Sequence, residues 1–443
     1  MLNKIFNVVY HHIVVVLIIT VGSVIGCCVY FMPITQHATF NVELNEPISK
    51  NYTDYFYDFY GYDVDLSNQL PYCFTTVGIQ EIRVNVGPFV YPLVFNVSDT
   101  KQPIVTIESL VVEQMDDIES LIQVKDDSDY TIEVSMEKIN SQWTSHGFEL
   151  AKVTYQVSDE FNNETYGEFV ALITNGQEVG KTLGLDYDQP LADIIDDYLT
   201  QYGLNKANLA YGYYNLITEE SVVLNENRYQ VAASTYKLPL NMVYCDLLEK
   251  GEISLTDQVV YEKKDYEIGA GYLETNHSIG DKINIKELMQ ESLFWSNNTA
   301  SRMLYKYLGG FESFKNIASD YAKNLGYEQH GKSNLISVNY LLACLKRIYR
   351  NQDTYDMMID ILAKASEDNY GRYTSKIPMM HKYGHYDTAL NDCGIVFGPI
   401  PFAFVILSES MSEIDVGNIV NIMVLYTLNH PGELSLDYNG SNK

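Results

Sequence analysis

The chain has 443 residues, with 29 Lys and Arg against 58 Asp and Glu, and its formal net charge is −29. This length predicts more than one domain. Hydrophobic residues make up 46% of the chain and charged residues 20%, which argues against global disorder. The acidity argues strongly against nucleic acid as a partner, because phosphate binding needs clustered Lys and Arg.

Residues 1–34 predict a cytoplasmic stub followed by a membrane anchor. Residues 8–32 contain no Lys, Arg, Asp or Glu, and about 20 apolar residues are enough for a helix to cross a bilayer. Lys4 precedes this run and a long acidic chain follows it, so we expect the N-terminus inside the cell and everything after Pro33 outside. Two alternatives remain, namely a cleaved signal peptide and a lipoprotein signal ending at Cys27.

Residues 35 to about 185 predict two small all-β domains, at 35–101 and 102–180. Apolar and polar residues alternate in these stretches, for example in Thr131-Ile-Glu-Val-Ser, which is typical of half-buried strands. The junction Ser98-Asp-Thr-Lys-Gln-Pro lies between two predicted strands. This order resembles the tandem Ig-like sandwiches of bacterial surface proteins. We expect an acidic spacer, with recognition of a wall polymer or a protein partner as the alternative.

Cysteine and histidine spacing gives no indication of a metal or another cofactor. Four cysteines follow the predicted anchor without any C-x-x-C spacing, at Cys73, Cys245, Cys344 and Cys393. We expect them to be buried free thiols rather than disulfides or metal ligands. The chain also lacks the H-E-x-x-H pattern of zinc hydrolases.

Residues 186–443 predict a third domain in which helices and strands alternate. A helix at 191–199 precedes two strands, several helices fill 234–365, and strands return near 391–407 before a last helix at 418–428. Two strands at the start and more at the end predict one sheet assembled from both ends. The expected fold is therefore α/β or α+β, with helices packed on a mostly antiparallel sheet.

An S-x-x-K motif in this third domain suggests chemistry. Serine and lysine at this spacing share one face of a helix, and a partly desolvated lysine can take the serine proton to make a nucleophile. The chain contains the pattern three times, at Ser98–Lys101, Ser135–Lys138 and Ser234–Lys237. The first two lie in predicted strands and turns, whereas Ser234 begins a predicted buried helix, whose N-terminus favours negative charge.

Two further motifs follow Ser234 in a fixed order, Ser296-Asn297-Asn298 and then Lys382-Tyr383-Gly384. The series resembles the S-x-x-K, S-D-N and K-T-G signature of class A β-lactamases and penicillin-binding proteins. The resemblance covers roughly residues 190–430. It implies a β-lactamase-like or transpeptidase-like catalytic domain. Together with the predicted anchor, it implies a protein that crosses a bacterial cell membrane once and has its catalytic domain outside the cell.

The resemblance also implies a role for each matching residue. Ser234 would attack the carbonyl of a β-lactam or of a D-alanyl-D-alanine-like amide and form an acyl-enzyme. Lys237 would be the base in that attack, and Ser296 would relay a proton to the leaving nitrogen. The implied catalytic residues are therefore Ser234, Lys237 and Ser296.

The remaining matching residues would bind the substrate. Asn298 would hydrogen-bond the side-chain amide of the substrate, and Lys382 would attract its carboxylate. Tyr383 and Gly384 complete this motif. The backbone N–H groups of Ser234 and His385 would form the oxyanion hole.

The sequence departs from the family pattern in three places. Asn297 stands where the family has aspartate, and Tyr383 stands where it has threonine, so that Tyr383 either binds the substrate or only packs. The segment 326–334 is too short for the family's Ω-loop and lacks its glutamate. Glu328 is the only carboxylate in this segment, and we expect it to be a solvated residue rather than a substitute base.

These departures leave several functions open. Without the Ω-loop glutamate as a base, we expect the acyl-enzyme to form but to be hydrolysed slowly. We do not expect His330, His381 or His385 to replace this glutamate. The favoured function is a membrane-anchored serine hydrolase, acting either on β-lactams or, as a penicillin-binding peptidase, on peptidoglycan stem peptides. A sensor without turnover is the alternative, and a purely structural surface protein would leave the ordered motifs unexplained.

Overall fold

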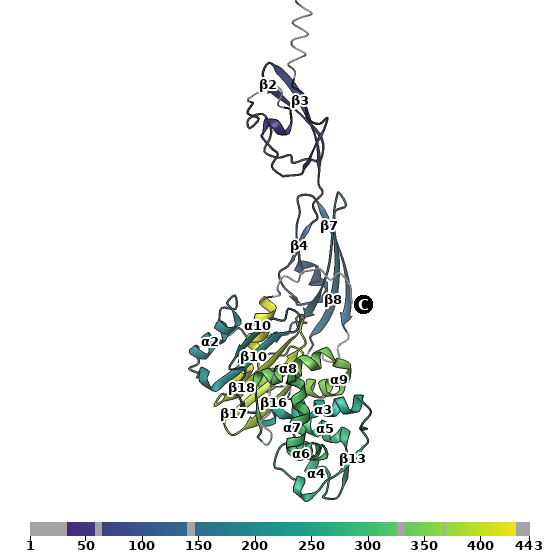
Figure 1. Ribbon diagram of the computed structural model, residues 1–443, viewed down its shortest axis with the longest axis vertical. Coiled ribbons are helices and arrows are strands. Elements are labelled where there is room, and N and C mark those ends of the chain that lie inside the picture. Colours follow the sequence, from purple (N-terminus) through teal and green to yellow (C-terminus); the bar gives the residue numbers. More distant parts are fainter. Residues whose placement is uncertain (1–32, 58–63, 140–146, 326–332, 367, 431–443) are drawn as a thin grey trace, which may run out of the picture. The chain divides into compact units, whose positions relative to one another are not determined.

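The computed structural model describes residues 33–57, 64–139, 147–325, 333–366 and 368–430. These residues form two compact units (Figure 1). The first unit takes its residues from Met1–Val105, Val124–Ile132 and Gln156–Thr165. The second takes its residues from Thr106–Gln123, Glu133–Tyr155 and Tyr166–Lys443.

The predicted location in a bacterial membrane is wrong on the evidence of the described residues. None of their helices is long and apolar enough to cross a membrane. The longest, α10 at Glu413–Asn429, has 17 residues and two acidic side chains in its first turn, and a helix of this length extends only about 25 Å. The anchor predicted at 8–32, with its possible lipid site at Cys27, lies outside the described residues.

The first unit contains a three-stranded sheet in the order β1-β3-β2. Its strands are β1 (Phe40–Glu43), β2 (Gly78–Val86) and β3 (Phe89–Ser98). Alternate residues of β3, namely Leu93, Phe95 and Val97, are buried, because successive side chains of a strand point to opposite faces. A short 3-10 helix, Tyr52–Asp54, covers the same core.

The strands that follow do not confirm the two predicted Ig-like modules. A four-stranded sheet has the order β5-β9-β8-β7, and β4 pairs with β6. Strands β7, β8 and β9 each contribute residues to both units, and the domain boundaries expected near 101 and 180 stay predictions. The bounds are β4 (Ile104–Ile107), β5 (Val111–Val112), β6 (Ile122–Lys125), β7 (Tyr130–Ile139), β8 (Glu149–Asp159) and β9 (Glu164–Ile173), with a 3-10 helix at Met115–Leu121.

The predicted third domain, residues 186–443, contains the predicted mostly antiparallel sheet. Five antiparallel strands run in the order β11-β10-β18-β17-β16. The early strand β10 pairs with the late strand β18, so the prediction of one sheet built from both ends is confirmed. The strands are β10 (Leu209–Asn215), β11 (Ser221–Leu224), β16 (Met379–Tyr386), β17 (Ala389–Val396) and β18 (Phe402–Glu409).

Helices cover both faces of this sheet (Figure 1). Helix α8 packs on β10 and β18, whereas α10 packs on β17 and against α2. The helices are α2 (Leu191–Gln201), α3 (Lys237–Glu249), α4 (Leu273–Asn276), α5 (Ile285–Leu293), α6 (Asn298–Tyr307), α7 (Phe311–Ala318), α8 (Val338–Arg350), α9 (Gln352–Ala363) and α10. Two short pairs complete the region, β12 (Gln230–Val231) with β15 (Leu335–Ile336), and β13 (Gln258–Val260) with β14 (Lys282–Asn284). Further 3-10 helices lie at Lys206–Asn208, Ala233–Tyr236, Lys263–Asp265, Ser319–Leu325 and Tyr370–Arg372.

Each face of the sheet has its own hydrophobic core. Along β18, Val405 and Leu407 belong to the core under α8, while Phe404 and Ile406 belong to the core under α10. A strand buried on both faces reads as a continuous apolar run, which is why residues 402–407 predict a strand without alternation. At Gly212 of β10 a Cβ atom would lie only 2.6 Å from Val338 of α8, so this helix approaches the sheet closely.

The cysteines of the described residues are free thiols. Burial raises the pKa of Cys245 to about 12 and that of Cys344 to about 12. These thiols therefore stay protonated near neutral pH and behave as apolar core groups.

Candidate active site

Ser234 lies in a sharp turn between β12 and α3. The preceding residue, Ala233, has a positive φ of 48°, a conformation that a residue with a Cβ atom rarely adopts. Thr235 holds the turn, since both its backbone N–H and its hydroxyl donate to the Ala232 carbonyl, at 3.0 and 2.7 Å. The turn brings Ser234 one helical turn from Lys237 at the start of α3.

Two asparagines from distant parts of the chain hold this turn on two sides. The Asn334 side chain donates to the Ala233 carbonyl at 3.0 Å, and the Asn334 backbone carbonyl accepts from the Ala232 N–H at 2.9 Å. The Asn391 side chain donates to the carbonyls of Val231 and Ala232 at 2.8 and 3.2 Å. These bonds keep a strained backbone in place beside Ser234.

The side chain of Lys237 is buried among four oxygen atoms. Its Nζ lies 2.6 Å from the Ser296 carbonyl, 2.7 Å from Asn298 Oδ1, 3.1 Å from Ser234 Oγ and 3.3 Å from Ser296 Oγ. The carbonyl and the amide oxygen can only accept hydrogen bonds. A neutral amine has two N–H groups for these two acceptors, and its lone pair then remains for the hydroxyl proton of Ser234.

Electrostatics favour this neutral amine. Burial lowers the pKa of Lys237 well below its usual value, and the nearby ammonium of Lys382 lowers it further, while Glu267 acts in the opposite direction. An unprotonated lysine at neutral pH is able to act as a base. The geometry and the charges therefore agree on one chemical role.

Ser296 connects the two lysines. Its Oγ lies 3.3 Å from Lys237 Nζ and 3.0 Å from Lys382 Nζ. Its backbone has a positive φ of 56°, and α6 begins two residues later. A hydroxyl that both donates and accepts, held between two amines, is able to pass a proton from one to the other.

Asn297 supports α6 rather than the reaction. Its side-chain oxygen accepts from the Ala300 N–H at 2.7 Å, and its amide nitrogen donates to Glu274 at 3.0 Å. An oxygen at this position caps a helix whether it belongs to asparagine or aspartate. The departure from S-D-N therefore keeps the capping function.

Lys382 and Gly384 lie on β16, the outer strand of the sheet. Lys382 is buried, and burial lowers its pKa to about 8 although Asp392 opposes the change. A Cβ atom at Gly384 would lie 2.6 Å from the backbone nitrogen of Ser234. Only glycine fits such a close approach, which brings the backbone of β16 against the nucleophile.

Tyr383, His385 and His381, the sequence neighbours of Lys382 and Gly384, lie in different surroundings. Tyr383 stacks on Tyr370 with ring centroids 4.5 Å apart, and it is not among the residues that line the cavity at Ser234. This placement fits the alternative that Tyr383 only packs. His385 does line the cavity, whereas His381 is buried beside Asp392.

The cavity at Ser234 has a volume of about 470 Å³. Its walls come from the turn at Ser234, the loop before α4, the start of α6, the segment before β15 and the end of β16. The lining residues are Val231, Ala233, Ser234, Tyr236, Glu267, Asn298, Ser333, Asn334, Leu335, His385 and Tyr386. Glu328 and His330 lie outside the described residues.

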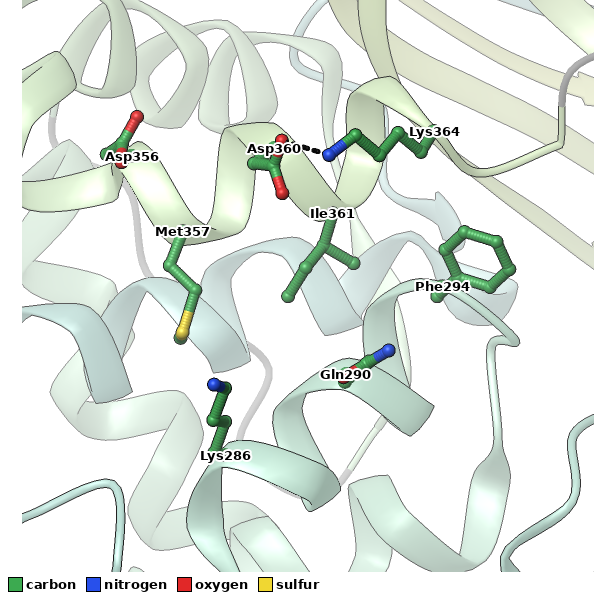
Figure 2. Close-up of a pocket in the computed structure, with 8 residues that line it drawn as sticks. All are labelled: Lys286, Gln290, Phe294, Asp356, Met357, Asp360, Ile361 and Lys364. Atoms are coloured by element: carbon green, nitrogen blue, oxygen red, sulfur yellow. Dashed lines mark hydrogen bonds and ion pairs between the residues drawn. The ribbon is translucent and has the colours of Figure 1, made fainter. Parts of the chain in front are cut away.

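A second pocket, of about 620 Å³, lies between α5 and α9 (Figure 2). It shares no lining residue with the cavity at Ser234. An ion pair joins Asp360 and Lys364 at 2.5 Å in its wall. The lining residues are Lys286, Gln290, Phe294, Asp356, Met357, Asp360, Ile361 and Lys364, and this set lacks a hydroxyl or thiol nucleophile.

One group of side chains in the described ranges has the spacing of metal ligands. Carboxylate oxygens of Asp99, Asp126 and Asp159 lie within 4.8 Å of one another. Neighbouring donors already bind them, since the Ser128 hydroxyl donates to Asp99, the Ser128 backbone N–H donates to Asp126, and the Asn163 side chain donates to Asp159. All three belong to the first unit, so they are no part of the Ser234 site.

Sequence reasoning missed three residues of the site. Asn334 and Asn391 act on backbone atoms, and Glu267 belongs to a loop without a motif. Asn391 begins a strand that the sequence predicts near 391–407, but its position in a strand does not indicate a contact with the Ser234 turn. The sequence gives no signal for Asn334 or Glu267.

Known proteins match the chain over this same region. A model of the β-lactamase enzyme family matches residues 190–421, slightly more than half of the chain. A comparison with curated proteins finds no match.

Solved structures cover a similar part of the chain. A β-lactamase from Sphaerobacter thermophilus is 19% identical over 54% of this chain and 95% of its own, with a TM-score of 0.45. One from Xanthomonas campestris is 16% identical over 56% and 100%, with a TM-score of 0.46, and PBP-A is 16% identical over 54% and 98%, with a TM-score of 0.47. Because these TM-scores are below 0.5, the assignment depends on the family model. The chain therefore belongs to the β-lactamase enzyme family, and it is a serine hydrolase of the β-lactamase superfamily.

Proposed function

We propose that the protein opens β-lactams by forming an acyl-enzyme at Ser234. The observation that carries this proposal is the position of Lys237 Nζ, 3.1 Å from Ser234 Oγ and bound to two oxygens that only accept. A buried neutral amine beside a hydroxyl is what activation of serine requires. The lysines of the other two S-x-x-K patterns pair with carboxylates instead, Lys101 with Glu46 and Lys138 with Glu149.

The proposed acylation moves one proton and exchanges one bond. Ser234 Oγ bonds to the carbonyl carbon of the lactam while Lys237 takes the hydroxyl proton. The C–N bond of the lactam then breaks, and the proton passes from Lys237 through Ser296 Oγ to the leaving nitrogen. The product is an ester on Ser234 that retains all the atoms of the substrate.

Binding groups around the serine would support this reaction. The ammonium of Lys382 is available for the carboxylate of the substrate, and Asn298 is available for its side-chain amide. Backbone N–H groups of Ser234 and His385 would stabilise the oxyanion, which is usually the largest single contribution to such reactions. The close approach of Gly384 to Ser234 supports this arrangement.

Hydrolysis of the ester needs a water molecule and a base, and here a second function has support. The chain passes from Leu325 to β15 at Leu335, which leaves little room for a loop carrying a glutamate. Slow deacylation would make the protein a penicillin-binding peptidase, acting on peptidoglycan stem peptides, rather than an efficient β-lactamase. A non-turnover sensor would form the same ester but would not go on to release a product from it.

Mass spectrometry of the intact full-length protein tests these functions. The protein is mixed with benzylpenicillin and sampled from seconds to hours, beside a Ser234→Ala variant. Ser135→Ala is the matched control, because it removes the serine of another S-x-x-K pattern. We expect an adduct with the mass of the whole penicillin in the wild type and in Ser135→Ala, and none in Ser234→Ala.

The time course of the adduct separates the alternatives. Decay of the adduct while penicillin is consumed identifies a β-lactamase. A persistent adduct identifies a penicillin-binding peptidase or a sensor, and release of D-alanine from a D-alanyl-D-alanine peptide then distinguishes these two. An adduct that survives in Ser234→Ala would contradict the proposed nucleophile.

A further inference from the structure

The cavity at Ser234 contains one acidic side chain in its described walls, that of Glu267. Ten other residues line this cavity, and none of them is an aspartate, a glutamate, a lysine or an arginine. A single charged group in a small cavity has a strong influence on which ligand charges are accepted. Glu267 is therefore placed to choose among substrates that the catalytic residues alone would treat alike.

The backbone of Glu267 is attached to the start of α6. Its N–H donates to Thr299 Oγ1 at 3.0 Å, and this hydroxyl donates to the Glu267 carbonyl at 3.2 Å. The Asn298 side chain donates to the Ile268 carbonyl at 2.8 Å. Asn298 also holds Lys237, so the carboxylate is carried by a segment tied to the catalytic residues.

The carboxylate of Glu267 has capacity for another cation. Its one ion pair within the described ranges is with Arg302 Nη1, which lies 3.5 Å from Oε2. Both side chains are exposed, at 46% and 41%, and exposed pairs of this kind are weak. A carboxylate accepts up to about four hydrogen bonds, so a ligand ammonium is able to bind without displacing Arg302.

The cavity faces the acyl side of the substrate. The leaving nitrogen must meet Ser296 Oγ, and the substrate carboxylate must meet Lys382, yet neither residue lines the cavity. Asn298 and Glu267 do line it. A substituent on the carbonyl side of the scissile amide would therefore extend toward Glu267.

From these observations we propose that Glu267 selects substrates whose acyl side chain carries an ammonium group. This inference rests on the proposed acylation of Ser234 and names its substrate class. The ammonium can belong to an aminated β-lactam or to a stem peptide with a free amine. Both sources present the same chemistry, a primary ammonium on the acyl side of an amide that Ser234 attacks.

Two pairs of compounds that differ only at the amine test the proposal. Ampicillin and benzylpenicillin differ by one amino group on the acyl side chain. A lysyl-D-alanyl-D-alanine peptide is compared with the same peptide acetylated on the lysine side chain. For each pair we compare the ratio of the two acylation rates, because an effect of a variant on both compounds cancels in this ratio.

The variants are made in the full-length protein. Glu267→Gln removes the charge at nearly constant volume, and Glu267→Lys reverses it. Glu252→Gln, at an exposed position on the turn after α3, removes the same charge outside the cavity and controls for the field of an acidic protein. We expect the wild-type preference for the amine to fall by about 1.5-fold to fivefold in Glu267→Gln, to reverse in Glu267→Lys and to persist in Glu252→Gln.

Each outcome has a definite meaning. A Glu267-dependent preference in the penicillins or in the peptides supports the proposal and identifies the source of the ammonium. Equal ratios in the wild type and Glu267→Gln, with adducts still formed, overturn the proposal and leave the proposed function intact. Absence of any Ser234 adduct from all four compounds overturns the proposed function, and this inference with it.

Discussion

The carboxylate of Asp392 lies 2.8 Å from Nδ1 of His381, and the two side chains form a completely buried pair between β16 and β17. The other ring nitrogen of His381 lies 3.2 Å from the Ala365 carbonyl. The Asp392 carboxylate also accepts from the backbone N–H groups of Gly371 and Cys393, at 2.8 and 2.9 Å. A buried hydrogen-bonded pair is thus built into the strand that carries Lys382.

Breaking this pair should destabilise the protein more than removing both members. Asp392→Asn replaces one acceptor oxygen with an N–H group, so at least one of the buried N–H groups of Gly371 and Cys393 loses its acceptor. We expect a loss of about 1–3 kcal/mol in the free energy of unfolding. The double variant His381→Leu/Asp392→Asn should recover part of this loss. Urea unfolding of the two variants measures the difference, and equal losses would contradict coupling between the two side chains.

The rate of acylation should fall as the pH rises through about 8. Lys382 attracts the substrate carboxylate only while it is protonated, and its pKa is about 8. Burial lowers the pKa of Lys237 well below its usual value, and loss of a proton from this base can only raise the rate as the pH rises. In Lys382→Arg the cation persists to far higher pH, so the decline near pH 8 should disappear. Stopped-flow acylation from pH 6 to 10 checks this, and an unchanged decline would assign it to another group.

Removing either asparagine beside the nucleophile should slow acylation. Asn334→Ala removes the side-chain donor to the Ala233 carbonyl, and Asn391→Leu removes the side-chain donor to the carbonyls of Val231 and Ala232. Without these bonds the strained turn can relax, and the rate should fall by at least about tenfold because misplacement of a reacting group is costly. Acylation kinetics and thermal unfolding are measured together. A loss of stability with unchanged kinetics would make these residues structural only.

Replacing Lys315 with methionine should flatten the dependence of stability on pH. Burial lowers the pKa of Lys315 to about 8, so between about pH 8 and 10.5 the unfolded chain binds more protons than the folded protein. Stability therefore rises with pH in this window, by at most about 1.4 kcal/mol per pH unit for one group. Lys315→Met should remove this share and raise the free energy of unfolding at pH 7, even though the Leu335 carbonyl loses its donor at 2.9 Å. Urea unfolding from pH 7 to 10 measures both effects, and an unchanged slope would contradict the prediction.

The sheet and much of the site follow from sequence patterns. Strands buried on both faces have continuous apolar runs, and residues 209–216 and 402–407 show this texture at the two ends of the catalytic region. The three motifs identify side chains that the fold brings together at Ser234. Their fixed order was the informative part, since S-x-x-K alone also occurs twice in the β-rich segment.

Other parts depend on contacts that no local pattern records. Asn391 binds the backbone before Ser234, about 160 residues earlier in the chain, and Glu267 reaches the cavity from a loop without a motif. Tyr383 is next to Lys382 in sequence, yet it stacks on Tyr370 instead of lining the cavity. The predicted Ig-like modules are not confirmed, since alternation predicts strands but does not determine how they pair.

The pairing of β10 with β18 also determines when the active site can exist during synthesis. The ribosome makes Ser234, Lys237 and Ser296 long before β16 and β17, so the nascent chain has these residues without Lys382, Gly384 or Asn391. Contacts of such long sequence separation form slowly. We therefore expect the Ser234 site to be inactive until the last three strands have emerged and closed the sheet. A chain interrupted before residue 379 would retain Ser234, Lys237 and Ser296 without the strands that hold the Ser234 turn.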